Sequence, residues 1–166
     1  MKTNILTTAL VIFGLAAITA QAQPHAKVFA NFNYDLSTEE AADGYKEFEV
    51  KRAYLGYGHS FNDNFSAKVT FDVGSNSGGS SYTAYLKIAA LSWKASDKMT
   101  INFGQVGTKN FKFMEKAWGK RYIYKSLQDQ NKWASSADAG ATIDYKVMDA
   151  MSIDAQILNG EGYKKI

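Results

Sequence analysis

Residues 53–73 read AYLGYGHSFNDNFSAKVTFDV, and the alternation in this stretch decides the fold class. From Asn64 to Val73 polar and apolar side chains alternate without interruption, with Phe65, Val69 and Phe71 on the apolar side. Successive side chains of a β-strand point to opposite faces, so the segment predicts a strand with one apolar and one polar face. In a soluble protein the apolar face would lie in the core, whereas in a membrane barrel it would face lipid. The alternation alone leaves both readings open.

The N-terminus predicts export. Lys2 supplies a positive charge, residues 5–20 (ILTTALVIFGLAAITA) are apolar apart from threonine, and Ala20-Gln21-Ala22 has the small residues that a signal peptidase reads. The alternative is a membrane anchor, for which the apolar run is short. We therefore expect a signal peptide over residues 1–22, and its removal from the 166 residues leaves 144, enough for one domain.

Composition favours an all-β chain. One proline, ten tyrosines, ten phenylalanines and thirteen glycines fit many short strands, and no segment after the signal approaches the apolar length of a membrane helix. The chain has no cysteine, so hydrogen-bonded architecture and packing must hold it together after export. Of the 19 basic residues one is Lys2, and 16 acidic residues oppose the rest. The mature chain is thus close to neutral, and we expect no nucleic-acid partner.

The spacing of apolar residues along the chain predicts about seven strands. They are expected near residues 26–35, 47–60, 64–73, 82–95, 99–106, 137–147 and 151–158. The connections between them run long, short, long, short, long, short. Outer-membrane barrels have this rhythm, with tight turns on the periplasmic side and long loops outside, and a soluble sandwich or barrel need not have it.

The polar strand faces agree with a barrel in a membrane. They carry the charged residues Arg52, Lys68, Asp72, Asp138, Asp144, Lys146 and Asp154. A membrane barrel would turn these side chains into its lumen, whereas a soluble barrel would expose them to solvent. Aromatic residues at strand ends, such as Tyr57 and Trp93, are typical of an interfacial girdle. We expect the apolar face to lie against outer-membrane lipid, with ordinary solvated strand faces as the alternative.

The segment 107–136, GTKNFKFMEKAWGKRYIYKSLQDQNKWASS, is unusually long for a connection and so predicts a functional loop. Between Lys109 and Lys125 six basic residues oppose only Glu115, with aromatic residues between them. Basic residues folded into a narrow lumen would concentrate anions and set charge selectivity. Two other readings remain: an external loop that binds acidic surface polymer, or a solvated face of a short helix.

Several stretches together resemble a known family. FEVKRAYLGY, FSAKVTFDVG, INFGQVGTKNFKFMEKAWGKRYIYKSLQDQ, SSADAGATIDY and LNGEGY are similar to the N-terminal part of outer-membrane porins of the phosphate-selective porin O and P type, and most similar to the porin-like members of Bacteroidetes. The resemblance covers essentially the whole mature chain. It implies a large antiparallel transmembrane β-barrel, usually a homotrimer at full length, with an inward-folding loop and basic residues that guide small anionic solutes.

Carried over position by position, the resemblance points to eight candidate anion-guiding, pore-lining residues. These are Arg52, Lys68, Lys109, Lys112, Lys116, Lys120, Arg121 and Lys125. The carboxylates of Asp72, Asp138, Asp144 and Asp154 are also expected in the lumen, which argues against strict anion selectivity.

The predicted strand count differs from the family. Family barrels have about twice as many strands, and an odd number of strands cannot close an antiparallel barrel of this type without a free edge. We therefore expect the chain to be a partial porin barrel, a fragment that forms no closed pore alone.

Enzymatic sites are not predicted. Neither His25, beside the cleavage site, nor His59, at a strand end, stands in a nucleophile arrangement, and no ligand spacing indicates a metal or cofactor. The expected function is passive diffusion of small solutes that favours anions such as phosphate. The alternatives are a small structural or adhesive outer-membrane barrel without a channel, and a soluble exported β-protein that binds a ligand.

Overall fold

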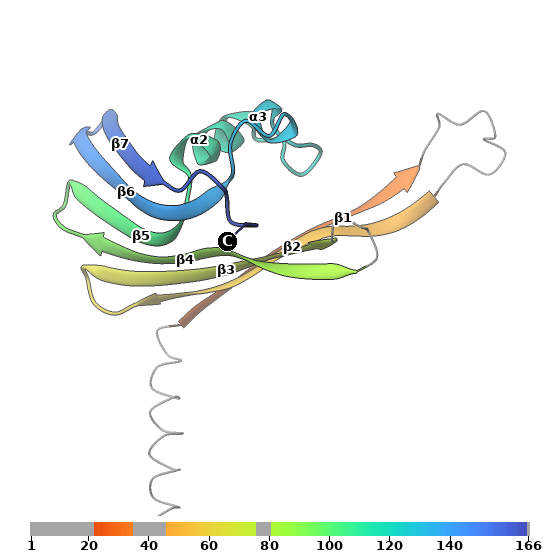
Figure 1. The fold of residues 1–166 in the computed structure, drawn as a ribbon, viewed down its shortest axis with the longest axis horizontal. Coiled ribbons are helices and arrows are strands. Elements are labelled where there is room, and N and C mark those ends of the chain that lie inside the picture. Colours follow the sequence, from red (N-terminus) through yellow and green to blue (C-terminus); the bar gives the residue numbers. More distant parts are fainter. Residues whose placement is uncertain (1–21, 35–45, 76–80, 166) are drawn as a thin grey trace, which may run out of the picture.

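The structure, a computed structural model, describes residues 22–34, 46–75 and 81–165. Over these ranges seven antiparallel strands form one open sheet in chain order (Figure 1). They are β1 (Ala22–Tyr34), β2 (Lys46–Ser60), β3 (Phe65–Ser75), β4 (Tyr82–Lys94), β5 (Met99–Gly107), β6 (Ala137–Met148) and β7 (Met151–Leu158). The predicted all-β antiparallel fold is confirmed, and the open sheet with edges β1 and β7 is consistent with part of a porin barrel. The predicted signal peptide up to residue 21 and the connections 35–45 and 76–80 lie outside the described residues.

Short turns join the strands at one end of the sheet. In the β2–β3 turn the side-chain oxygen of Asn62 accepts hydrogen bonds from the backbone N–H groups of Asn64 and Phe65 at 2.9 and 2.8 Å. In the β4–β5 turn the Ser96 hydroxyl accepts from the N–H groups of Lys98 and Met99. Local side-chain acceptors of this kind replace ladder hydrogen bonds and fix tight turns. The long connections leave from the opposite strand ends, as the sequence predicts.

The outer face of the sheet is apolar and exposed. Leu55 and Tyr57 on β2 lie beside Val69 and Phe71 on β3, and all four are at least 37 % exposed. Leaving one such side chain in water forfeits roughly 2 kcal/mol relative to burying it. A soluble barrel would turn this face inward. The sheet does the opposite, which is the arrangement of a barrel wall whose outer face meets lipid.

The inner face is polar and covered. Its buried side chains include Thr70, Asp72, Asp138 and Thr142. Two short helices between β5 and β6, α2 (Lys109–Trp118) and α3 (Leu127–Gln130), lie over the concave side, and the chain after β7 turns back onto it (Figure 1). The segment 108–136, hereafter the long loop, is therefore folded over the inner face, and its basic part is partly helical.

β-Bulges on β2 and β4 change which residues face inward. The β1–β2 register skips Lys51 between the pairs Phe29–Arg52 and Ala30–Val50, and the β3–β4 register skips Lys87. One extra residue inverts the alternation on its strand. On β2 the outward positions therefore change from Phe48 and Val50 to Leu55 and Tyr57. The uninterrupted alternation expected for the second and fourth strands is wrong at these two points. A further register irregularity skips Val147 near the end of the β6–β7 pair.

Strand boundaries otherwise differ from the expectation by only a few residues. The largest difference is at β1, which begins at Ala22 instead of Ala26 and pairs with β2 as far as His59. Pro24 lies inside the added part and has no N–H to donate to a ladder. An edge strand tolerates this because one of its sides has no partner strand.

Gly104 and Gly140 allow β5 and β6 to approach their neighbours on the inner face. The two glycines are paired across the strands, and their φ angles are +115° and +154°. A Cβ atom at Gly104 would lie 2.3 Å from the Ala89 carbonyl oxygen, and one at Gly140 would lie 2.1 Å from that of Ile157. Only glycine fits such a close approach, which permits the strong curvature of this part of the sheet.

Candidate functional site

A connected polar cluster occupies the inner face of β2, β3 and β4. The Arg52 Nε atom lies 3.1 Å from Asp72 Oδ1, and Arg52 Nη1 donates a hydrogen bond to Tyr54 Oη at 3.3 Å. Lys87 Nζ donates to the same tyrosine oxygen at 3.3 Å and lies 4.6 Å from the Tyr54 ring centroid. Arg52, Tyr54, Asp72 and Lys87, together with Tyr163, are called the wall cluster below.

Tyr163 joins the wall cluster from the far end of the chain. Its hydroxyl donates a hydrogen bond to Asp72 Oδ2, and its ring lies 5.1 Å from Lys87 Nζ. Burial raises the pKa of the Tyr163 phenol above its usual range, and the Asp72 carboxylate raises it further. Tyr163 is therefore neutral and a donor over the whole physiological range.

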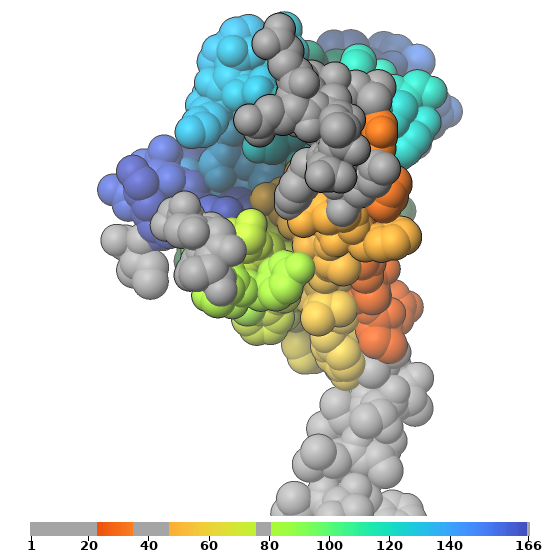
Figure 2. Space-filling model, turned by 90° about the vertical axis from the view of Figure 1, so that its right-hand side faces the viewer, coloured from red at the N-terminus to blue at the C-terminus, as the bar shows by residue number. Residues whose placement is uncertain are grey.

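Backbone contacts hold the C-terminal segment, residues 159–165, in this position. The N–H groups of Asn159 and Tyr163 donate to the carbonyl oxygens of Ala139 and Ala137 at 3.0 and 3.1 Å. Asp138 Oδ2 accepts from the Gly160 N–H at 2.7 Å. In Figure 2 the blue C-terminal residues lie beside the green part of the wall, and Lys164 Nζ is 4.4 Å from the Tyr85 ring centroid. The segment is thus tied to β6 at its base and to β2–β4 at its end.

The base of the long loop is closed by Thr108. Its hydroxyl donates to the Ser135 carbonyl oxygen at 2.6 Å, and its N–H donates to that of Ser136 at 3.2 Å. Phe111, in the first turn of α2, is buried, as are Val106 and Ala137 in the strands that flank the loop. The two ends of the loop therefore meet, and α2 begins directly over the inner face.

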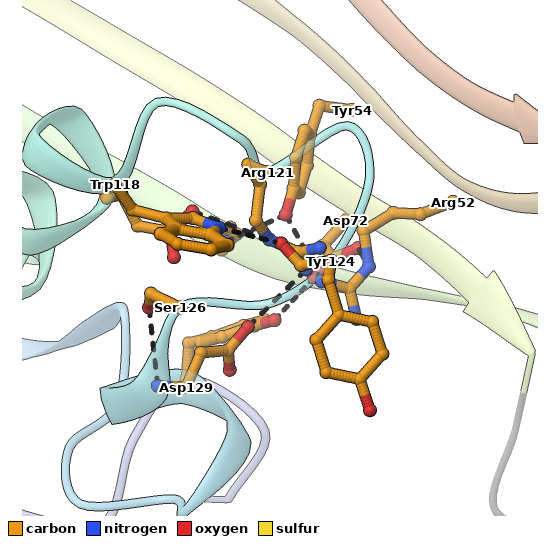
Figure 3. A network of polar contacts seen from close by, with 11 residues as sticks. Arg52, Tyr54, Asp72, Trp118, Arg121, Tyr124, Ser126 and Asp129 are labelled. Atoms are coloured by element: carbon orange, nitrogen blue, oxygen red, sulfur yellow. Dashed lines mark hydrogen bonds and ion pairs between the residues drawn. The ribbon is translucent and has the colours of Figure 1, made fainter.

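Arg121 links the parts of the long loop. Its Nε atom lies 3.4 Å from Glu115 on α2, and its Nη2 atom lies 3.4 Å from Asp129 on α3. The guanidinium also lies 5.7 Å from the ring centroid of Phe29 on β1, which packs edge-on against Tyr54. Figure 3 shows Arg121 between the loop and the wall residues Arg52, Tyr54 and Asp72. One arginine thus binds both acidic residues of the loop and brings the loop to the wall.

Lys109 anchors α2 to the opposite part of the sheet. Its ammonium forms an ion pair with Asp144 on β6, and its backbone N–H donates to Gln156 Oε1 on β7 at 2.9 Å. A row of polar side chains continues across the strands, in which Asn102 Nδ2 donates to Thr142 at 3.0 Å and to Asp144 at 3.3 Å. The helix and the β5–β7 wall therefore form one polar unit.

The remaining lysines of the long loop are exposed. Lys112 and Lys116 lie three and seven residues after Lys109, so all three share one face of α2. Lys120 and Lys125 follow in the connection to α3, and both are exposed. Across the described ranges no acidic side chain forms an ion pair with these four exposed lysines. The loop therefore presents more positive than negative charge to solvent.

In a comparison with protein-family models, residues 25–117 match the model of phosphate-selective porin O and P. The match runs from β1 to the end of α2 and covers more than half of the chain. The chain belongs to this porin family. Neither the curated proteins nor the solved structures that were compared gave a match.

The structure brings some of the predicted site residues of this porin together and leaves others apart. Arg52 belongs to the wall cluster and Arg121 lies next to it through Phe29, whereas Lys109 lies at the β6 side of the inner face. Lys68 is exposed on the inner face of β3, nearer the short turns, at the level of Gly58 and Ala90. Lys112, Lys116, Lys120 and Lys125 extend from Lys109 along the long loop. Their role in guiding anions remains a prediction.

Three of the four carboxylates expected in the lumen of the porin are engaged. Asp72 binds Arg52 and Tyr163, Asp144 binds Lys109, and Asp138 accepts backbone N–H groups from Ala139 and Gly160. Asp154, beside Asp144 on β7, is exposed. The expected competition between acidic and basic residues in the lumen is therefore reduced, because most of the acidic groups are already paired.

Lys87 is an inner-face basic residue that the sequence prediction missed. Like Ala89, Leu91 and Trp93, which face outward, Lys87 has an odd residue number. A strand without a bulge would therefore turn its side chain outward, into lipid. A signal was present in the sequence. Tyr82, Ala84 and Leu86 are outward at even positions and Ala89, Leu91 and Trp93 at odd ones, so the alternation must break between them. Tyr163 was also missed, because it lies after the last predicted strand, in a stretch without periodicity.

The family is a channel family and not an enzyme family, and the two histidines lie in structural contacts. His25 Nε2 is 3.0 Å from Thr70 Oγ1 on the inner face, and the His59 ring packs edge-on against Phe61. In the part of the chain that the structure describes, neither helix is long and apolar enough to span a bilayer.

Proposed function

We propose that this porin lets small solutes diffuse passively across the outer membrane of a Gram-negative bacterium and that it favours anions such as phosphate. Membership of the phosphate-selective porin family supports the solute class. The observation that carries the preference is the pairing of charges on the inner face. Asp72, Asp138 and Asp144 are engaged internally, while Lys112, Lys116, Lys120 and Lys125 are exposed on the long loop.

In this mechanism the long loop narrows the lumen and its lysines raise the local anion concentration. Fixed positive charges at a constriction lower the barrier for anions and raise it for cations. No cofactor or covalent step takes part. The exposed apolar outer face supports a position among outer-membrane lipids, and the family supports a homotrimeric assembly.

Zero-current potentials in a KCl gradient test the proposal. Protein purified from outer membranes in detergent is inserted into planar bilayers, and the anion-to-cation permeability ratio is measured. We expect a ratio above one, which the Lys112→Gln/Lys116→Gln variant lowers by about threefold for two charges lost near the ion path. The matched control is Lys98→Gln, which removes an exposed charge from a short turn at the other end of the sheet. Equal ratios in wild type and loop variant would refute the role of the loop lysines.

A channel-free structural barrel is the second candidate. The observation in its favour is that α2, α3 and the C-terminal segment all cover the inner face of the described sheet (Figure 1). Conductance separates the two functions. A folded, heat-modifiable protein that never produces conductance steps would support the structural barrel and overturn the porin mechanism.

A further inference from the structure

We infer that Tyr163 is a specificity-determining residue that screens the Asp72 carboxylate from ions in the lumen. The inference rests on the proposed anion preference. It explains how one acidic side chain in the middle of the wall is kept from contact with passing solutes. Tyr163 would act on selectivity through Asp72 and not by touching the solute.

Asp72 is buried and its carboxylate oxygens are covered by other side chains. Its side chain is only 2 % exposed, although it sits on the inner face of β3 in the middle of the wall. Arg52 covers one carboxylate oxygen from β2, and the Tyr163 hydroxyl covers the other from the C-terminal segment. An ionised carboxylate needs partners of this kind when it is removed from water.

Positive charges lie on the same part of the inner face as Asp72. Arg52 is paired with the carboxylate, and the Nζ atoms of Lys87 and Lys164 lie 4.4 to 5.9 Å from the ring centroids of Tyr54, Tyr85 and Tyr163. With Asp72 covered, a passing ion meets three cations and three tyrosine side chains. Without Tyr163 it would also meet an ionised carboxylate.

Backbone hydrogen bonds attach the segment that contains Tyr163 to β6. The hydrogen bond from the Tyr163 N–H to Ala137 and that from the Gly160 N–H to Asp138 fix the segment that delivers the ring. Tyr163 is therefore held at its backbone, independently of its hydroxyl. Replacing the hydroxyl alone should uncover Asp72 without releasing the segment.

Carboxylate labelling tests the screening directly. Intact protein in detergent is treated with a water-soluble carbodiimide and glycinamide, and the peptides are quantified by mass spectrometry. We expect Asp72 to be labelled at least about tenfold more slowly than Asp97, whose side chain is 95 % exposed. In Tyr163→Phe the Asp72 rate should rise at least about threefold, whereas Tyr85→Phe, which keeps the hydroxyl of Tyr163, should leave it unchanged. Labelling of Asp72 at the Asp97 rate in wild type would overturn the inference even if no variant folds.

Selectivity supplies the second measurement. Tyr163→Phe should lower the anion-to-cation permeability ratio about threefold, because cations in the lumen can then approach the Asp72 carboxylate to within several ångströms. Asp72→Asn/Tyr163→Phe should restore the ratio to the wild-type value or above. If the wild type shows no anion preference, the proposed function fails while slow Asp72 labelling would still support the screening. If the wild type prefers anions and Tyr163→Phe changes neither measurement, the inference fails alone.

Discussion

Gly104 and Gly140 show how single residues set the shape of this wall. Both are on the inner face, and in both cases a neighbouring carbonyl oxygen occupies the place where a side chain would begin. A residue with a Cβ would have to move a strand or leave the positive-φ conformation. The curvature that lets the sheet wrap around the long loop therefore depends on two missing side chains.

Gly104→Ala should destabilise the folded protein by roughly 1–3 kcal/mol, because alanine is strained at a φ of +115°. The folded fraction, read from heat-modifiable migration across a urea series, measures the loss. Gly58→Ala is the matched control on the same face, since its nearest neighbour atom would be 3.9 Å from the new Cβ. Equal urea midpoints for the two variants would contradict the strain argument.

Tyr163 provides a prediction for alkaline pH. Its pKa is raised in the folded state by burial and by Asp72, so the folded protein disfavours the phenolate. The stabilising contribution is complete below the pKa of an unfolded tyrosine, about 10, and is lost as the pH rises through the folded-state pKa. We expect one tyrosine of the wild type to ionise only as the protein unfolds, followed by absorbance at 295 nm and by circular dichroism. That late step should be missing in Tyr163→Phe, and a wild type in which all tyrosines ionise before unfolding would disprove it.

At the scale of single elements, the bulges at Lys51 and Lys87 decide which side chains meet water. Each adds one residue to its strand, and each exchanges the inward and outward positions beyond it. Lys87 gains access to Tyr54 and Tyr163 in this way, while Leu86 and Ala89 on either side remain outward. The charge of the wall thus depends on strand register as well as on composition.

Cysteine substitution tests the β4 bulge on a chain that has no cysteine of its own. In protein embedded in lipid, Lys87→Cys should react with a charged, water-soluble maleimide, whereas Leu86→Cys and Ala89→Cys should not, because both face lipid. An unbulged strand would give Lys87→Cys and Ala89→Cys the same reactivity. The mass shift of each variant after a fixed exposure to the reagent distinguishes the two registers.

The long loop is held as a unit by Arg121, which bridges α2 and α3. Its two ion pairs are partly exposed, so together they contribute only about 1 kcal/mol. Arg121→Gln should therefore leave the sheet folded and make the loop open about fivefold more often. Limited chymotrypsin digestion reads this opening, since exposed aromatic residues such as Tyr122 and Tyr124 lie in the loop. Lys132→Gln is the charge-matched control, and equal digestion rates would count against the bridging role.

At the scale of the whole molecule, the described strands form an open sheet with an apolar outer face. Strand edges cannot remain unpaired in lipid, because each unsatisfied backbone group costs several kcal/mol there. β1 and β7 are edges within the described ranges. In the membrane they must pair with further strands, either of the same chain or of another copy.

The mass of the folded species in outer-membrane extracts tests this requirement. We expect it to exceed the mass of one chain of the 144 residues predicted to remain after signal-peptide removal, either as a larger polypeptide or as an oligomer of several chains. Intact-mass spectrometry of the denatured protein and native mass spectrometry of the folded one distinguish the two sources. A folded, monomeric species of 144 residues would show that the edges are satisfied in some other way.

Sequence periodicity predicted most of the wall. The alternation of residues 64–73 fitted β3, because that strand has no bulge, and the gaps between the periodic segments marked the short connections. The long loop was predicted by its length and basic composition, and its short helix was one of the readings left open. The family resemblance agreed with the family match.

The missed features depend on tertiary contacts. Lys87 points inward only because β4 carries one residue more than β3 across the ladder, which no local propensity reports. Tyr163 reaches Asp72 across 91 positions of sequence, through a segment with no periodicity of its own. The pairing of Arg121 with both loop acids likewise follows from how α2 and α3 fold back on each other.

The bulges also have a consequence for mutational scans and for protein engineering. On β1 and β3 the water-facing residues are all odd-numbered or all even-numbered along the whole strand. On β2 and β4 they change from odd-numbered to even-numbered at Lys51 and Lys87. In a scan of charged substitutions along β2 and β4, the tolerant positions should change from odd-numbered to even-numbered residues at the bulge. Deletion of either lysine would remove the bulge and leave one unbroken alternation with the outward side chains still outward, whereas deletion of one residue elsewhere on β2 or β4 would exchange the two sides beyond that point and should be far more harmful.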